Sequence, residues 1–152
     1  MDVLYFAFAN DAVHPLKTLQ QEDNEINTIL EPLAAKGHFK IIRDSYASLD
    51  SIAEKLMLYK DQIVLFHFGG HAGNQHLQLD SGKASALGIS ELLGKCPRLK
   101  VVILNGCATI GQVELLHSKN IPIVIGTYRP IEDKKAFHFE LKAVVFQCTL
   151  HQ

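Results

Sequence analysis

The sequence predicts an α/β fold with a mostly parallel, doubly wound sheet, because short apolar strands alternate with amphipathic helices. Two apolar runs, residues 63–68 and 99–104, are rich in Val, Ile, Leu and Phe, as buried parallel strands are. Each run breaks at glycine and then carries one reactive side chain, His71 or Cys107. Because ligands bind at the carboxyl edge of such sheets, we expect both side chains at that edge.

The first elements are a strand at 3–9, a helix and a second strand at 39–43. Pro15 is a favoured first residue of a helix and Gly37 a favoured stop, so the first helix is expected between them. Apolar side chains at helical spacing mark its buried face: Leu16, Leu19, Ile26, Ile29, Leu30 and Leu33. Ser48 is expected to cap the next helix, where Ser51 and Glu54 fit a capping-box spacing.

The second half of the chain continues the alternation. Leu77 and Leu79 alternate with polar residues after the third strand, which suggests a short exposed hairpin. The later elements are expected to be a short helix at 89–93, a strand at 99–104, a helix at about 112–119, a strand at 122–126 and a last helix from Asp133.

Composition indicates one globular domain at residues 1–152. Hydrophobic residues make up 47% and charged residues 20%, and a net charge of −1 without a basic block gives no support for nucleic-acid binding. No apolar run reaches the roughly 20 residues that span a bilayer. Three cysteines without a paired motif, and no signal-peptide pattern, predict a cytoplasmic location. The apolar tail at 143–150 indicates either a truncated or altered C-terminus or a natural end.

Four phrases resemble the CHAT domain, a caspase-like peptidase domain of the clan of caspases, separase and gingipains. They are HFGGHA at 67–72, LNGCAT at 104–109, VLYFAFAN at 3–10 and VIGTYRPIED at 124–133. The resemblance implies a three-layer caspase-like fold with strand order 2-1-3-4-5. It also implies a cysteine peptidase near the shorter bacterial relatives, within a larger signalling protein that has fused ATPase or repeat domains.

Cys107 and His71 have the chemistry of a nucleophile and its general base. The start of a helix near Gln112 favours the Cys107 thiolate, and Gly106 allows a substrate to approach closely. The backbone N–H groups of Cys107 and Ala72 would form an oxyanion hole. The alternative for Cys107 is a small residue packed under the turn, and for His71 a loop histidine held by a hydrogen bond.

Other polar residues on this edge have two interpretations each. His67, which lies earlier in the same strand, is expected to be a core histidine, although a supporting role for His71, together with Gly70, stays open. A zinc site of His67, His71 and His76 lacks the usual spacing, so no metal and no cofactor is predicted. Residues 69–73 could cradle a phosphate, but they lack the GxGxxG pattern and a Walker lysine.

A substrate pocket is harder to predict. Asp80 could bind a basic substrate residue, and so could Asp133, but a turn or helix-cap role is favoured for both. Arg129 could bind a substrate carboxylate or form an ion pair with Glu132 or Asp133.

The leading functional hypothesis is a cysteine endopeptidase that acts on a protein or peptide. Two other classes stay open: a catalytically silent regulatory or protein-interaction module with the same fold, and a flavodoxin-like nucleotide-binding domain. The Cys107–His71 pair argues against the first and the missing phosphate loop against the second.

Overall fold

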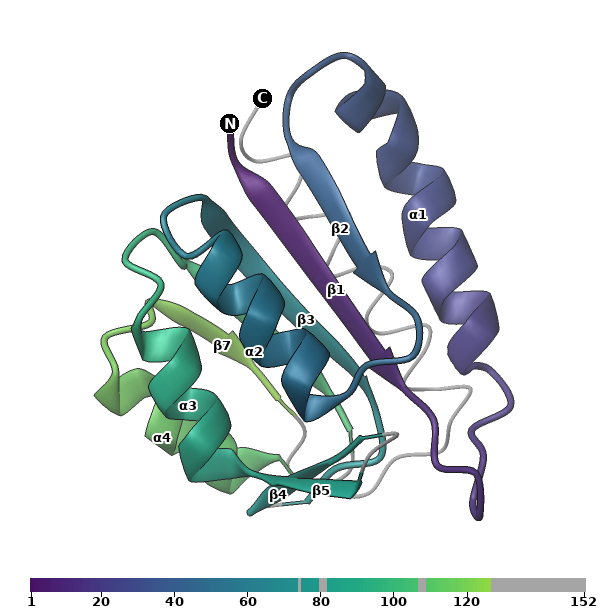
Figure 1. Ribbon diagram of the computed structural model, residues 1–152, viewed down its shortest axis with the longest axis vertical. Helices are drawn as coiled ribbons and strands as arrows, with labels where there is room; N and C mark the ends of the chain where they lie inside the picture. The colour runs from purple at the N-terminus through teal and green to yellow at the C-terminus, as the bar shows by residue number, and fades with distance from the viewer. Residues whose placement is uncertain (74, 80–81, 107–108, 127–152) are drawn as a thin grey trace.

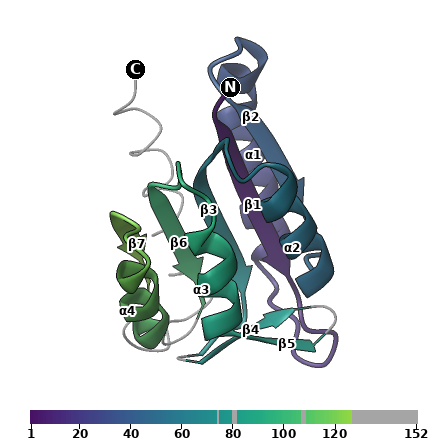
Figure 2. The ribbon, with the colours of Figure 1, turned by 60° about the vertical axis from the view of Figure 1, so that its left-hand side comes forward.

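A five-stranded parallel sheet forms the centre of the molecule in the computed structural model, which describes residues 1–73, 75–79, 82–106 and 109–126. The strand order is β2-β1-β3-β6-β7, as Figures 1 and 2 show, and every neighbouring pair is parallel. The strands are β1 (Val3–Ala9), β2 (Lys40–Asp44), β3 (Ile63–Gly70), β6 (Val101–Asn105) and β7 (Ile123–Ile125). Counted along the chain without the hairpin, this order is 2-1-3-4-5, as expected.

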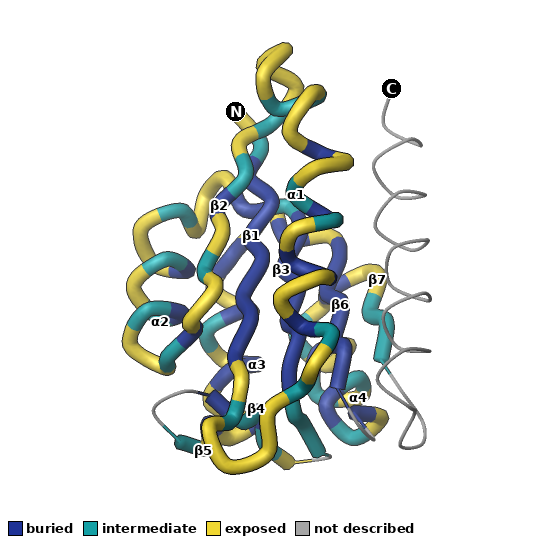
Figure 3. Tube along the Cα trace, turned by 90° about the vertical axis from the view of Figure 1, so that its right-hand side faces the viewer, coloured by how far each residue is buried: buried dark blue, intermediate teal, exposed yellow. Residues whose placement is uncertain are grey.

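Helices cover both faces of the sheet and make three layers (Figures 1 and 2). They are α1 (Leu19–Ala35), α2 (Leu49–Leu58), α3 (Ala86–Gly94) and α4 (Ile110–Ser118). One apolar cluster joins α1 to the face of the sheet that carries Phe6, Phe8 and Ile103. The second cluster joins side chains of α2, α3 and α4 to the opposite face, through Phe66 and Leu104 among others. The central strands are buried along their length, as Figure 3 shows.

The hairpin consists of β4 (His76–Leu79) and β5 (Gly82–Ser85), which pair antiparallel beside the carboxyl ends of the sheet strands. Figure 1 shows it at the lower end of the sheet. It is less exposed than the sequence suggested, because Leu77, Leu79 and Ala84 all enter the core on the α3 side. Period-two alternation therefore located the hairpin correctly, but the apolar face packs on the domain rather than facing solvent.

The first helix begins at Leu19, four residues later than Pro15 predicted. Residues 10–18 instead form a loop in which side chains bond the backbone: Asn10 bonds Leu16, and Asp11 accepts from the Val13 N–H. Short polar side chains compete with helix formation in this way. At α2 the capping box joins Ser48 and Ser51, whose hydroxyls each accept from the other residue's N–H, so Glu54 is not its partner.

Helix length also bears on membrane insertion. Among the helices within the described ranges, none has both the length and the apolar character that a bilayer crossing requires.

Candidate active site

His71 lies directly after β3, at the carboxyl edge of the sheet, and is half-buried. Its Nε2 lies 2.5 Å from the backbone carbonyl oxygen of His14, in the loop after β1. A carbonyl oxygen can only accept a hydrogen bond, so Nε2 carries the hydrogen. In the neutral ring the lone pair is therefore on Nδ1, and that atom is the one able to take a proton.

The loop that provides this carbonyl is folded by its own side chains. Asn10 accepts from the Leu16 N–H at 2.7 Å and donates to the Leu16 carbonyl at 3.3 Å. Asp11 accepts from the Val13 N–H at 2.9 Å, and that bond, with smaller contributions from His14 and His71, lowers the pKa of the Asp11 carboxyl. A carboxylate is thus maintained in the loop that faces His71.

The residue before Cys107 packs directly against the segment that carries His71. Strands β3 and β6 pair in parallel, with Gly69 opposite Asn105. The segments that follow the two strands therefore leave the sheet side by side. A Cβ added to Gly106 would lie 2.4 Å from the Ala72 Cβ and 3.0 Å from the Gly70 carbonyl oxygen. Only glycine fits this approach without a shift of the backbone.

Gly70 is the second position where the backbone requires glycine. Its φ is +155°, and a Cβ there would meet the Ala9 carbonyl oxygen at 2.5 Å. The chain can therefore turn out of β3 close beside β1, which directs the following residue, His71, toward the loop after β1. Backbone packing thus explains Gly70, whereas a Cβ on Gly69 would meet the Phe8 ring at 2.8 Å.

Helix α4, which follows Cys107, is hydrogen-bonded to the segment that begins at His71. Gln112, buried in the first turn of α4, donates from its side-chain Nε2 to the carbonyl oxygens of Gly73 at 2.5 Å and His76 at 3.1 Å. Gly106 before Cys107 and Gln112 after it thus both contact the stretch that begins at His71.

The Ala72 N–H, predicted as an oxyanion donor, lies outside the two backbone bonds of a short bridge. Ala72 pairs with Leu77 in this antiparallel bridge, through the bonds Gln78 N–H to His71 carbonyl and Gly73 N–H to His76 carbonyl. Neither bond uses the Ala72 N–H. That group lies 3.2 Å from the position of a Cβ on Gly106, beside the start of the Cys107 turn.

A buried polar cluster lies beneath this edge, on the α1 side of the sheet. Glu22 of α1 accepts from the Asn105 side-chain Nδ2 through both carboxylate oxygens, at 3.1 Å each, and its Oε1 lies 3.2 Å from His67 Nε2. His67 is 0% exposed and Glu22 3% exposed, and the rings of Phe6 and Phe8 lie beside His67. His67 is therefore a core residue tied to α1 and, through Glu22, to the end of β6.

Several predicted residues lie outside the described part of the chain: Cys107, Asp80, Arg129 and Asp133. The expected approach of Cys107 to His71 therefore stays a prediction, as do the substrate roles of Asp80 and Arg129. Across the residues that are described, no three metal-binding side chains gather at one point. His67, His71 and His76 thus do not form the zinc site that was weighed.

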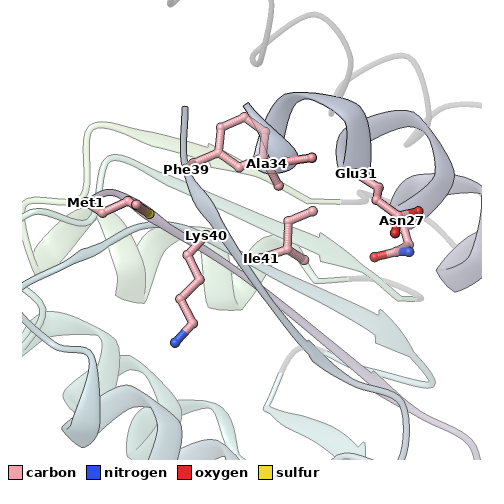
Figure 4. A pocket seen from close by; sticks show the side chains of 8 residues that line it. Met1, Asn27, Glu31, Ala34, Phe39, Lys40 and Ile41 are labelled. Carbon is pink, nitrogen blue, oxygen red and sulfur yellow. The ribbon is translucent and has the colours of Figure 1, made fainter. Parts of the chain in front are cut away.

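Two shallow cavities lie at opposite ends of α1. The first, of about 390 Å³, opens beside the carboxyl ends of β1 and β2, where Asn10 and Tyr46 line it with the Asp23–Arg43 pair. The second, of about 420 Å³, lies at the amino end of β2 between Phe39, Ile41 and the end of α1, as Figure 4 shows. Only the first is at the same edge as His71.

Sequence reasoning missed the residues that position the predicted ones. Glu22 had a usable signal, because it lies on the apolar face of α1 between Leu19 and Ile26 and so had to be buried. Gln112 and Asn10 had no comparable signal, since their partners are backbone groups from other segments. The His14 carbonyl has none at all, because every residue carries a carbonyl.

The sequence was also compared with known proteins. No protein-family model matches it, and no curated protein matches it.

Proposed function

We propose that this chain is a cysteine endopeptidase of caspase-like type, with Cys107 as nucleophile and His71 as general base. The observation that carries the proposal is the packing of both flanks of Cys107 on the His71 segment. Gly106 contacts Gly70 and Ala72, and Gln112 bonds the Gly73 and His76 carbonyls. Only Cys107 and Ala108 separate Gly106 from the described residues that resume at Thr109.

The hydrogen bond on Nε2 of His71 supports the role of general base, because it leaves the Nδ1 lone pair for the thiol proton. In the proposed reaction, Nδ1 takes the proton of the Cys107 thiol, and the thiolate sulfur bonds the carbonyl carbon of the scissile peptide. The carbonyl oxygen becomes an oxyanion that the N–H groups of Ala72 and Cys107 would stabilise.

Collapse of this intermediate breaks the C–N bond, and Nδ1 gives its proton to the leaving amine. Water then attacks the thioester with His71 again as base. The carbon–sulfur bond breaks, the carboxylic acid leaves and the proton returns to sulfur. The substrate is a protein or peptide, and no metal or other cofactor takes part in any of these steps.

The caspase-like, CHAT-type assignment of the fold belongs to the same proposal, supported by the parallel order β2-β1-β3-β6-β7. So do a cytoplasmic location and a role within a larger signalling protein with fused ATPase or repeat domains. A reducing compartment would keep a catalytic thiol reduced, and Cys96 is a buried free cysteine.

The test is covalent labelling with a library of peptides that end in an electrophilic ketone, read by mass spectrometry. The wild-type chain should be labelled at Cys107, and His71→Ala should label at least a hundredfold more slowly, the usual contribution of a general base. His38→Ala is the matched control, because His38 is exposed beside the amino end of β2.

Equal labelling rates in wild type, His71→Ala and His38→Ala would refute the catalytic pair. Complete absence of peptide-directed labelling at Cys107 would instead favour the catalytically silent regulatory module.

A further inference from the structure

The Asn10 side chain closes the loop that contacts His71. It bonds both backbone groups of a single residue, Leu16, six positions along the chain. The intervening stretch includes His14, whose carbonyl accepts from His71 Nε2. The His14 side chain is 76% exposed, so its ring does not hold this stretch in the core. The loop geometry thus depends on polar contacts made within the loop.

We propose that Asn10 is a positioning residue for His71. By folding residues 11–16 it presents the His14 carbonyl to Nε2, which selects the ring tautomer that leaves Nδ1 free to accept a proton. The side-chain bonds described above join Asn10 to the Leu16 backbone, so its effect on His71 passes through the loop. The catalytic consequence of this inference rests on the proposed function, whereas the effect of Asn10 on the His71 tautomer does not.

The physical reasoning concerns the two neutral forms of imidazole. They interconvert readily in water, and the hydrogen bond that one nitrogen makes decides which form predominates. One ordinary hydrogen bond shifts such an equilibrium roughly fivefold. When Asn10 no longer holds Leu16, the loop gains backbone freedom and the His14 carbonyl spends less time at Nε2. The fraction of rings with a proton-accepting Nδ1 then falls.

The experiment measures the tautomer directly, by the ¹⁵N chemical shifts of the His71 ring in the histidine-labelled full chain. The His71 signals are identified by their loss in His71→Ala. Wild type should show a protonated Nε2 and an unprotonated Nδ1 at a pH where the ring is neutral. Asn10→Ala should move both shifts toward averaged values, and Asn10→Asp, which keeps the acceptor for the Leu16 N–H, should stay closer to wild type.

Asn27→Ala is the matched control, because Asn27 lies on α1 at the cavity by the amino end of β2. It should leave both shifts unchanged. Thermal unfolding of all variants separates this effect from a loss of structure, since a merely structural role for Asn10 would lower the melting temperature without changing the tautomer of the folded fraction.

Labelling of Cys107 by the peptide probe forms the second arm. A roughly fivefold shift of the tautomer ratio, from about 5:1 to about 1:1, lowers the fraction of rings with a free Nδ1 by less than about twofold, so a fall in rate of that size is expected in Asn10→Ala. A His71 ring that keeps a single Nε2-protonated form in Asn10→Ala overturns the inference. So does a wild-type ring protonated on Nδ1. A tautomer shift in Asn10→Ala combined with no effect of His71→Ala on labelling supports the inference and rejects the proposed function, so the two failures are distinguishable.

Discussion

Removal of the Glu22 carboxylate should destabilise the fold strongly. In Glu22→Ala two buried donors lose their acceptor: Asn105 Nδ2, now 3.1 Å from both carboxylate oxygens, and His67 Nε2, 3.2 Å from one of them. An unsatisfied buried donor costs about 1–3 kcal/mol, and the breaking of a buried ionic or hydrogen-bonded pair about 3–5 kcal/mol in total. We expect a loss of about 3–5 kcal/mol in the free energy of unfolding.

Urea unfolding followed by circular dichroism measures this loss. Glu22→Gln keeps one acceptor oxygen and should lose less, about 1–2 kcal/mol. Glu25→Ala is the control on the same helix, because Glu25 accepts a hydrogen bond from the Gln21 side chain on the surface, and it should cost under about 0.5 kcal/mol. If Glu22→Ala unfolds within about 0.5 kcal/mol of wild type, the cluster does not bear on stability and the reasoning is refuted.

Three further predictions concern the glycine contact and the thiols. Gly106→Ala would bring its Cβ to 2.4 Å from that of Ala72, so it should cost about 1–3 kcal/mol in urea unfolding and, on the proposed function, slow peptide turnover roughly a hundredfold. Gly94→Ala, whose Cβ would meet the Lys119 side chain at 3.3 Å, should cost less. Cys96 is buried, and burial raises the pKa of its thiol to about 11. Brief iodoacetamide treatment at pH 7, followed by peptide mapping, should therefore label Cys107 and spare Cys96. Equal labelling of the two would remove the argument for an activated thiol. That pKa lies above its ordinary 9.0, so the thiol ionises first in the unfolded chain. Stability that is complete below about pH 8 is therefore lost between pH 9 and 11, by at most about 3 kcal/mol, and Cys96→Ala should make this loss shallower.

The strands were predictable because a strand buried on both faces has an almost unbroken run of apolar residues. Residues 3–9 and 99–104 are apolar at nearly every position, and both correspond to central strands of the sheet. Helix ends were less predictable. Proline is favoured at the start of a helix, which predicted a start at Pro15. The Asn10 side chain instead accepts the hydrogen bond of the Leu16 N–H, and α1 begins at Leu19.

The candidate site likewise has a part that the sequence predicted and a part that it did not. Glycine followed by histidine or cysteine at the end of an apolar run is visible in the sequence, and so His71 and Gly106 were selected correctly as residues of one sheet edge. The amide of Gln112 on the Gly73 carbonyl was not visible, because a side chain that bonds a distant backbone group leaves no periodicity.

The sequence by itself determined which residues form strands, the α/β class and the edge of the sheet to which His71 belongs, since these follow from apolar patterning and from the parallel direction of the strands. Only the tertiary structure decided which nitrogen of His71 carries the hydrogen and what lies beneath the edge. The His14 carbonyl and Glu22 reach their partners, His71 and Asn105, from segments 57 and 83 positions away in the chain. Contacts over such separations depend on how the layers pack, which no local pattern of residues specifies.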